Sequence, residues 1–145
     1  MKDNSLHREI IEEHVRSPVG NLKLTEFTHS ASYQSDKTGN VCTLQLLEKK
    51  GEIVEVGFLV EGSALALATA SVLSSIVKGM QTSEVQNLSL NIIAYLESAF
   101  EFDLPGDLSV YHSIRNYPER FDCALLAWRT LNKALINEFQ KEPLR

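Results

Sequence analysis

Residues 62–79 begin Gly62-Ser63-Ala64-Leu65-Ala66-Leu67-Ala68-Thr69-Ala70-Ser71 and end Val77-Lys78-Gly79. Small and apolar side chains occupy every side of a helical repeat here, which predicts a helix packed all round rather than one facing water. Ser63 is a typical helix cap after a glycine turn, and Gly79 is a typical stop. We expect a buried helix from Ser63 to about Lys78, whose first turn presents free backbone N–H groups.

An antiparallel β-hairpin is expected directly before this helix. Val41, Thr43 and Gln45 alternate with Cys42, Leu44 and Leu46, a period of two. Lys49-Lys50-Gly51-Glu52 predicts a tight turn and Ile53–Val60 the returning strand, with residues 23–33 a weaker candidate for a third strand. Because Cys42 shares a face with two leucines, we expect a buried core residue rather than a ligand or a nucleophile.

Helices are expected in the rest of the chain. One is predicted from Leu6 to Arg16, capped by Asn4 or Ser5. The others are predicted at 82–99, at 107–115 as a short helix or turn, and from Pro118 to about Gln140. Strands followed by helices indicate an α+β fold, with about five helices packed on one face of a small three-stranded antiparallel sheet. We expect one domain spanning residues 1–145.

The composition of the chain argues against several classes of function and location. The net charge of −5 and the scattered Lys and Arg residues argue against nucleic-acid binding. The apolar stretch 64–77 is interrupted by Thr and Ser and is too short to span a bilayer, so no membrane association is expected. The polar start of the chain lacks the apolar core of a secretory signal, which predicts a cytoplasmic protein. Two cysteines do not form a disulfide framework.

Residue spacing alone reveals no catalytic constellation. The sequence has no glycine-rich phosphate loop, no Ser–His–Asp signature and no CxxC pair, so we do not expect an enzyme. His7 and His14 lie seven residues apart, near one face of the first helix. A metal role for them is one interpretation, and two solvated histidines on a surface helix is the favoured one.

Four segments carry a more specific pattern. In chain order, they are Arg8-Glu9-Ile10-Ile11 followed by His14 and Pro18; Thr38-Gly39-Asn40 leading into the strand 41–46; Gly62-Ser63-Ala64 with its helix; and Tyr117-Pro118-Glu119-Arg120-Phe121-Asp122-Cys123-Ala124-Leu125-Leu126-Ala127-Trp128. Together they resemble the U-type iron–sulfur cluster scaffold family, which comprises SufU, IscU and the N-terminal domain of NifU. The last segment is the most specific, since the family has Pro-x-Arg-x-x-Cys-x-x-Leu-x-Trp there.

The resemblance implies a site for an iron–sulfur cluster or zinc, held by three cysteines and an aspartate. It places the first cysteine position at Thr38, the aspartate at Asn40, the second cysteine at Ser63 and the third at Cys123. Only Cys123 keeps a thiol, and one thiolate cannot replace the four ligands of a two-iron cluster. Asp122 is a weak candidate for an extra oxygen ligand, and an exposed helix-start acid is the favoured interpretation.

We therefore expect a scaffold-like protein of iron–sulfur cluster assembly that has lost most metal ligands. It would bind metal weakly or not at all and act through contacts with a cysteine desulfurase or another assembly protein. The alternatives are a non-catalytic regulator of a desulfurase or scaffold, a sulfur carrier based on Cys123, and a Cys123-bridged oligomer that shares a metal. The interpretation requires Thr38, Asn40, Ser63 and Cys123 to meet in space.

Overall fold

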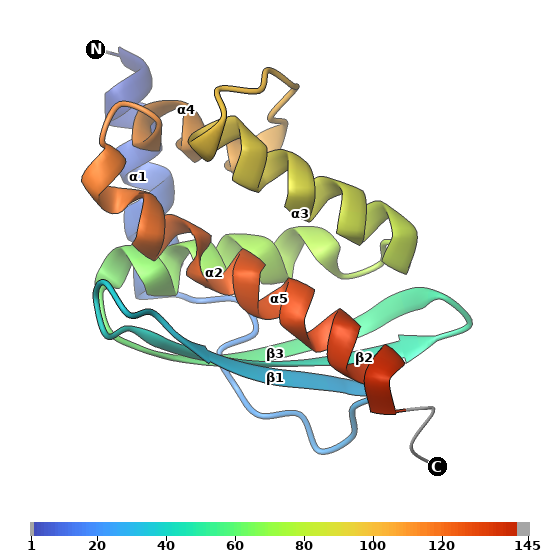
Figure 1. Cartoon of the computed structure of the whole chain (residues 1–145). Helices are drawn as coiled ribbons and strands as arrows, with labels where there is room; N and C mark the ends of the chain where they lie inside the picture. The colour runs from blue at the N-terminus through green and yellow to red at the C-terminus, as the bar shows by residue number, and fades with distance from the viewer. Residues whose placement is uncertain (1, 142–145) are drawn as a thin grey trace.

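The computed structural model describes residues 2–141 of the chain, and the side chains of residues 7–136. Along the chain the elements are α1 (Lys2–Arg16), β1 (His29–Gln34), β2 (Val41–Lys49), β3 (Glu52–Glu61), α2 (Ala64–Val77), α3 (Thr82–Glu97), the 3-10 turn η1 (Gly106–Ser109), α4 (Val110–Ile114), the 3-10 turn η2 (Pro118–Arg120) and α5 (Phe121–Lys141). Figure 1 shows helices stacked above one sheet. The expected α+β fold is confirmed.

The sheet is antiparallel in the order β1-β2-β3. Leu44 of β2 lies opposite Ala31 of β1 and Phe58 of β3, and all three side chains are buried. The α2 and α5 helices cover this face of the sheet, and α3 lies along α5 on the side away from the strands (Figure 1). Cys42 belongs to the same face and is fully buried, which confirms its prediction as a core residue.

The hairpin that joins β2 to β3 turns at Lys50 and Gly51. Both residues have positive φ angles, 55° and 86°, which matches the two-residue turn that follows the natural twist of the strands. A β-bulge between Leu47 and Glu48 shifts the register just before this turn. The predicted hairpin is confirmed.

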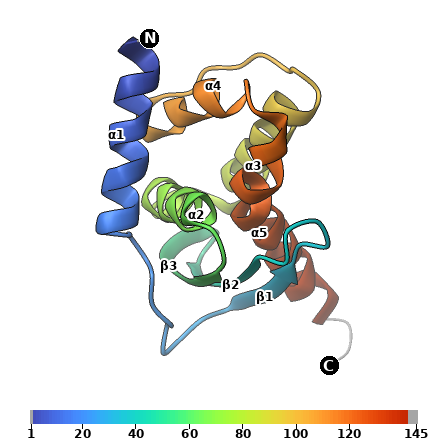
Figure 2. The same cartoon turned by 90° about the vertical axis from the view of Figure 1, so that its left-hand side faces the viewer.

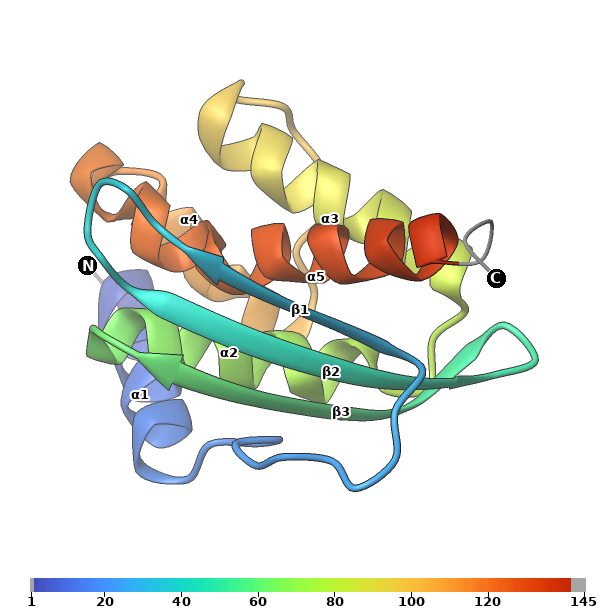
Figure 3. The same cartoon turned by 60° about the horizontal axis from the view of Figure 1, so that its bottom comes forward.

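The strand expected at residues 23–33 is shorter than predicted. It begins at His29, although the Thr28 N–H still donates to the Leu46 carbonyl oxygen of β2 at 2.8 Å. The chain before Thr28 passes around the edge of β3 (Figure 3). The Phe58 N–H donates to the Gly20 carbonyl oxygen at 2.8 Å. Leu22 and Leu24 lie against Gly57, where a Cβ atom would come within 2.7 Å of the Leu22 carbonyl oxygen. This close approach gives the segment a covering role on the outer face of the sheet.

The α2 helix is largely enclosed, as its composition predicts, although Ala64 and Ser75 are exposed. Ser63 caps it by accepting a hydrogen bond from the Ala66 N–H at 3.1 Å, and Gly79 follows it with a φ of 95°. Packing partners lie all around it, with β3, α5 and α1 on different sides (Figure 2). Small side chains let these elements approach closely, so α2 forms the centre of the molecule.

The other helices differ from prediction mainly at their ends. The α1 helix begins at Lys2, so Asn4 and Ser5 lie inside the helix and are not its caps. The α3 helix ends at Glu97, shortly before Ala99 with its positive φ of 56°. Pro118 forms the 3-10 turn that leads into α5. Among the described residues, no helix is long and apolar enough to cross a membrane.

Candidate functional site

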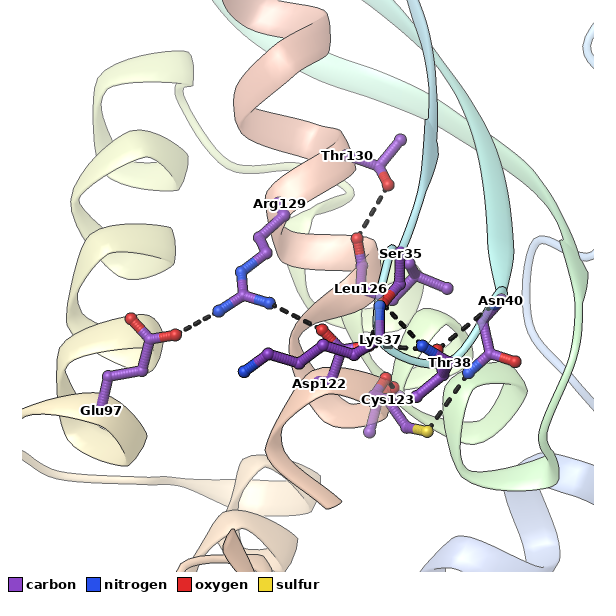
Figure 4. Close-up of polar contacts among 11 residues, drawn as sticks. Ser35, Lys37, Thr38, Asn40, Glu97, Asp122, Cys123, Leu126, Arg129 and Thr130 are labelled. Carbon is purple, nitrogen blue, oxygen red and sulfur yellow. Dashed lines mark hydrogen bonds and ion pairs between the residues drawn. The ribbon is translucent and has the colours of Figure 1, made fainter. Parts of the chain in front are cut away.

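Three segments that are distant in sequence meet at one end of the molecule. Thr38 and Asn40 lie on the loop between β1 and β2, Ser63 lies at the start of α2, and Cys123 lies in the first turn of α5. Asn40 Nδ2 donates to Cys123 Sγ at 3.2 Å (Figure 4), and the Ser63 N–H donates to Asn40 Oδ1 at 3.2 Å. Asn40 N–H donates to Thr38 Oγ1 at 3.3 Å. The four predicted positions therefore converge, and we call them the Asn40 cluster.

The orientation of the Asn40 amide is set by its neighbours. The Ser63 N–H can only donate, so the oxygen of the amide must face Ser63 and the NH2 group must face the sulfur of Cys123. Gly62 makes room for this arrangement, since a Cβ atom there would lie 2.0 Å from Asn40 Oδ1. The buried Asn40 thus presents a hydrogen-bond donor, not a metal ligand, to the one thiol of the site.

The environment of Asp122 differs from the exposed position expected from the sequence. Its side chain is 12% exposed, so it is not an exposed helix-start acid. One oxygen accepts hydrogen bonds from the hydroxyls of Ser35 and of Thr38, the latter at 3.1 Å, and the other accepts from Arg129 at 3.3 Å. Arg129 also pairs with Glu97 of α3 (Figure 4). Asp122 thereby joins the β1–β2 loop to α5. Sequence reasoning missed both partners: Ser35 lies 87 residues away, whereas Arg129 lies seven residues further along α5, a spacing that could have pointed to it.

Cys123 opens onto a cleft of about 580 Å³ between α1 and the turn before α5. Its side chain is partly exposed, and the cleft is also lined by Ser63, Arg8 and Arg120. The Arg120 guanidinium lies 4.8 Å from the centre of the Tyr117 ring. Glu12 and Glu119 line the same cleft, so Cys123 faces an open surface with charges of both signs, unlike the enclosed Cys42.

The donor set of the Asn40 cluster does not fit a complete metal centre. It comprises one thiol, two neutral hydroxyls and one amide whose nitrogen faces the sulfur. Iron–sulfur clusters and structural zinc sites are held chiefly by thiolates and imidazoles. Across the part of the chain that the structure describes, no group of three or more His, Cys, Asp or Glu side chains is arranged to hold a metal ion.

Both histidines of α1 point inward, so the expectation of two solvated histidines is wrong. Each is 6% exposed. His14 Nδ1 lies 2.6 Å from Ser71 Oγ, and His14 Nε2 lies 2.6 Å from Asp107 Oδ2. The Nδ1 atom of His7 bonds to the Ser113 hydroxyl. The polar partners come from α2, η1 and α4, which the pattern of α1 alone does not reveal.

Serine, histidine and aspartate therefore do meet in this fold, although their spacing gives no signature. We call His14, Ser71 and Asp107 the His14 cluster. The Ser71 side chain is fully buried in the centre of α2, and its hydroxyl also accepts a hydrogen bond from the Val19 N–H at 2.7 Å. A substrate has no access to such a serine, so the His14 cluster is a structural link between α1, α2 and η1.

Burial also determines the chemistry of Cys42. Desolvation raises the pKa of its thiol to about 11, and a hydrogen bond with Thr130 opposes this shift only in part. The thiol is thus protonated at neutral pH as well as inaccessible. This agrees with the prediction that Cys42 is neither a ligand nor a nucleophile.

Comparisons with known proteins agree on one family. The family model described as the NifU-like N terminal domain matches residues 6–144. The chain is 25% identical to the zinc-dependent sulfurtransferase SufU of Bacillus subtilis, over 93% of this chain and 92% of that protein. It is 27% identical to the iron–sulfur cluster assembly scaffold protein IscU of Thermotoga maritima, over 90% and 92% respectively.

Solved structures show the same fold. A protein from Fervidobacterium islandicum, described as an iron–sulfur cluster assembly scaffold for the SUF system, superimposes with a TM-score of 0.81 at 26% identity. That match covers 88% of this chain and 94% of the other. The N-terminal part of a NifU-like protein from Brucella abortus has a TM-score of 0.80 at 20% identity, over 92% and 93% of the two chains, and shows the fold alone.

Proposed function

Because this chain belongs to the family of NifU-like N-terminal domains, we propose that it acts in iron–sulfur cluster assembly as a scaffold-like protein that has lost most of its metal ligands. The observation that carries the proposal is the Asn40 cluster, in which the four positions that the resemblance assigns to the family's ligands meet but supply a single thiol. The protein then works through contacts with assembly partners, a cysteine desulfurase or another scaffold, and catalyses no reaction of its own. The name of its IscU relative supports the scaffold role, whereas its SufU relative is named a zinc-dependent sulfurtransferase, so the names do not support the absence of catalysis.

Reconstitution with iron and sulfide under anaerobic conditions tests the loss of the metal site. We expect far less than one cluster per chain after desalting, because one thiolate cannot replace four protein ligands. The IscU protein of Thermotoga maritima, treated in parallel, serves as the reference for the procedure. Absorbance in the visible range and iron content are the measurements. A stable, stoichiometric cluster on the isolated monomer would refute the proposal.

Partner contact is tested by co-purification with a cysteine desulfurase of the SUF type. We propose that the partner binds around the cleft beside Cys123, where Arg8 and Arg120 are exposed. Reversing charge with Arg8→Glu is expected to weaken retention of the desulfurase at least several-fold. Lys78→Glu, at the far end of α2 where Lys78 pairs with Glu55, is the matched control. Equal retention by both variants, or no retention of the desulfurase by the wild type, contradicts this docking site.

A second candidate function is that of a sulfur carrier, favoured by the position of Cys123. Its sulfur accepts a hydrogen bond from Asn40 and opens onto the cleft. In this role the Cys123 thiolate attacks the terminal sulfur of a partner's cysteine persulfide. A new S–S bond forms to Cys123, the partner's S–S bond breaks, and the partner's cysteine leaves as a thiolate, so no external oxidant is needed.

Mass spectrometry after incubation with a desulfurase and cysteine distinguishes the two functions. A carrier gains the mass of one sulfur atom on Cys123, and Cys123→Ser removes this gain while Cys42→Ala keeps it. A purely contact-based protein binds the desulfurase but gains no sulfur. Because Cys42 is fully buried, its variant is the appropriate control for non-specific sulfur uptake.

A further inference from the structure

We propose that the side-chain amide of Asn40 does, in this chain, the structural work that a bound metal would do at the same place. It links the β1–β2 loop, the start of α2 and the start of α5 through fixed hydrogen bonds. The folded site is then complete without metal. This inference concerns the isolated chain and goes beyond the proposed function, since it needs no partner.

The first support is that Asn40 uses all of its polar groups in this role. Its backbone oxygen accepts from the Ser35 N–H at 2.9 Å, and its backbone N–H donates to Thr38 Oγ1 at 3.3 Å. Its side-chain oxygen and nitrogen are engaged with Ser63 and Cys123, each at 3.2 Å. An asparagine with four partners on three segments holds those segments together, as a shared ligand would.

The second support is the space that the amide fills. Asn40 is 6% exposed, and its Oδ1 atom lies where a Cβ atom of residue 62 would come within 2.0 Å. Gly62 also has a φ of 148°, a conformation that side chains disfavour. The backbone of the turn before α2 therefore packs closely against Oδ1 of Asn40, and only a glycine at position 62 permits this approach.

The third support is chemical. A metal bound to a thiolate lies about 2.3 Å from the sulfur, in the direction of the other ligands. Here that direction holds the NH2 group of Asn40, 3.2 Å from Cys123 Sγ, and its hydrogens repel a cation. The isosteric substitution Asn40→Asp replaces this donor with an oxygen that can bind metal, so it reverses the chemistry while keeping the shape.

Thermal unfolding of the wild type and two single variants provides the first test. We expect the wild-type Tm to be unchanged by excess Zn²⁺ or by a chelator, because the site lacks ligands for zinc. Asn40→Ala should lower the Tm by about 3–10 °C, because it leaves the Ser63 N–H without its acceptor. Hydrogen exchange of the Ser63–Ala66 amides should accelerate in the same variant. Asn87→Ala, at an exposed position of α3, is the matched control.

Rebuilding the ligands provides the second test. In the triple variant Thr38→Cys, Asn40→Asp, Ser63→Cys, the three new side chains and Cys123 form a set of four metal ligands. We expect this variant to bind one Zn²⁺ per chain and a chelator to lower its Tm. The inference is overturned if Zn²⁺ raises the Tm of the wild type, or if Asn40→Ala leaves both Tm and exchange unchanged. It is also overturned if the triple variant shows native circular dichroism but binds no zinc. None of these results depends on desulfurase binding. The results for Asn40→Ala and for the triple variant test this inference alone, whereas stabilisation of the wild type by Zn²⁺ would also count against the proposed loss of metal ligands.

Discussion

At the scale of single residues, the two cysteines show how the fold assigns different chemistry to the same side chain. Cys42 faces the sheet–helix core and is fully buried, whereas Cys123 opens onto the cleft. A pKa raised from 9.0 to about 11 lowers the thiolate fraction of Cys42 at neutral pH about 100-fold. Any sulfur chemistry of this protein is therefore confined to Cys123.

Alkylation with iodoacetamide at neutral pH should distinguish the two thiols. We expect Cys123 to be labelled in the folded protein and Cys42 only after denaturant is added, because the thiolate is the reactive species and Cys42 is both protonated and enclosed. Peptide mass spectrometry over a time course is the measurement. Labelling of Cys42 in native protein at a rate comparable to that of Cys123 would contradict the described core.

The raised pKa of Cys42 also predicts a dependence of stability on pH. The unfolded thiol ionises near pH 9 and the folded one near pH 11, so stability is intact below pH 9 and is lost as the pH rises between these values. From about pH 8 to about pH 10.5, the wild type should lose about 2 kcal/mol more free energy of unfolding than Cys42→Ala. Burial raises the pKa of Tyr111 as well, but that contribution is common to both proteins.

Urea denaturation at the two pH values measures this difference. Cys42→Ala lowers the stability at both pH values through its lost packing, so the change with pH, not the absolute value, is the quantity to compare. Parallel pH profiles for the two proteins would show that Cys42 ionises equally in the folded and unfolded states.

At the scale of the elements, α1 is joined to the rest of the fold by buried polar contacts. The His14 cluster connects it to α2 and η1, and the bond between His7 and Ser113 connects it to α4. The partly buried Ile10 and Ile11 supply its apolar contacts with the core. A helix with so narrow an apolar stripe depends on these histidines for its place.

Replacing His14 should therefore loosen α1 specifically. His14→Ala removes a buried ring and two hydrogen bonds, and we expect a loss of about 2–4 kcal/mol in the free energy of unfolding. Faster hydrogen exchange should be concentrated in residues 8–16. Glu9→Ala, at an exposed position on the same helix, should change stability by less than about 0.5 kcal/mol. Equal stability of the two variants would mean that the His14 cluster contributes nothing.

Sequence patterns correctly predicted the features that depend on residues close together in the chain. The alternation around Cys42, the Lys50-Gly51 turn and the cap at Ser63 each depend on neighbouring residues, and the structure confirms them. His14 was misjudged as solvated because its partners lie 57 or more residues away, and Asp122 because Ser35, which draws it under the β1–β2 loop, lies 87 residues away. The resemblance predicted that the four positions of the Asn40 cluster meet, and they do. It could not predict which way the Asn40 amide is turned, because the contacts with Ser63 and Cys123 determine where its oxygen and its nitrogen lie.

At the scale of the whole molecule, one continuous core underlies both polar clusters. Buried residues from the sheet and from α2, α3, α4 and α5 form a single hydrophobic cluster that includes the fully buried Trp128. The Asn40 cluster uses the start of α2 at Ser63, and the His14 cluster uses its middle at Ser71. Eight residues of helix separate these attachment points by about 12 Å.

The two clusters should thus contribute independently to one cooperative unfolding transition. They share no residue and lie farther apart than the range over which side chains couple directly, so Asn40→Ala and His14→Ala should be additive to within about 0.5 kcal/mol. Urea unfolding of the single and double variants measures this. Trp128 fluorescence and far-ultraviolet circular dichroism should report the same midpoint in every variant. A coupling above about 1 kcal/mol would instead mean that α2 transmits strain between the clusters, and that the site and the placement of α1 form one energetic unit.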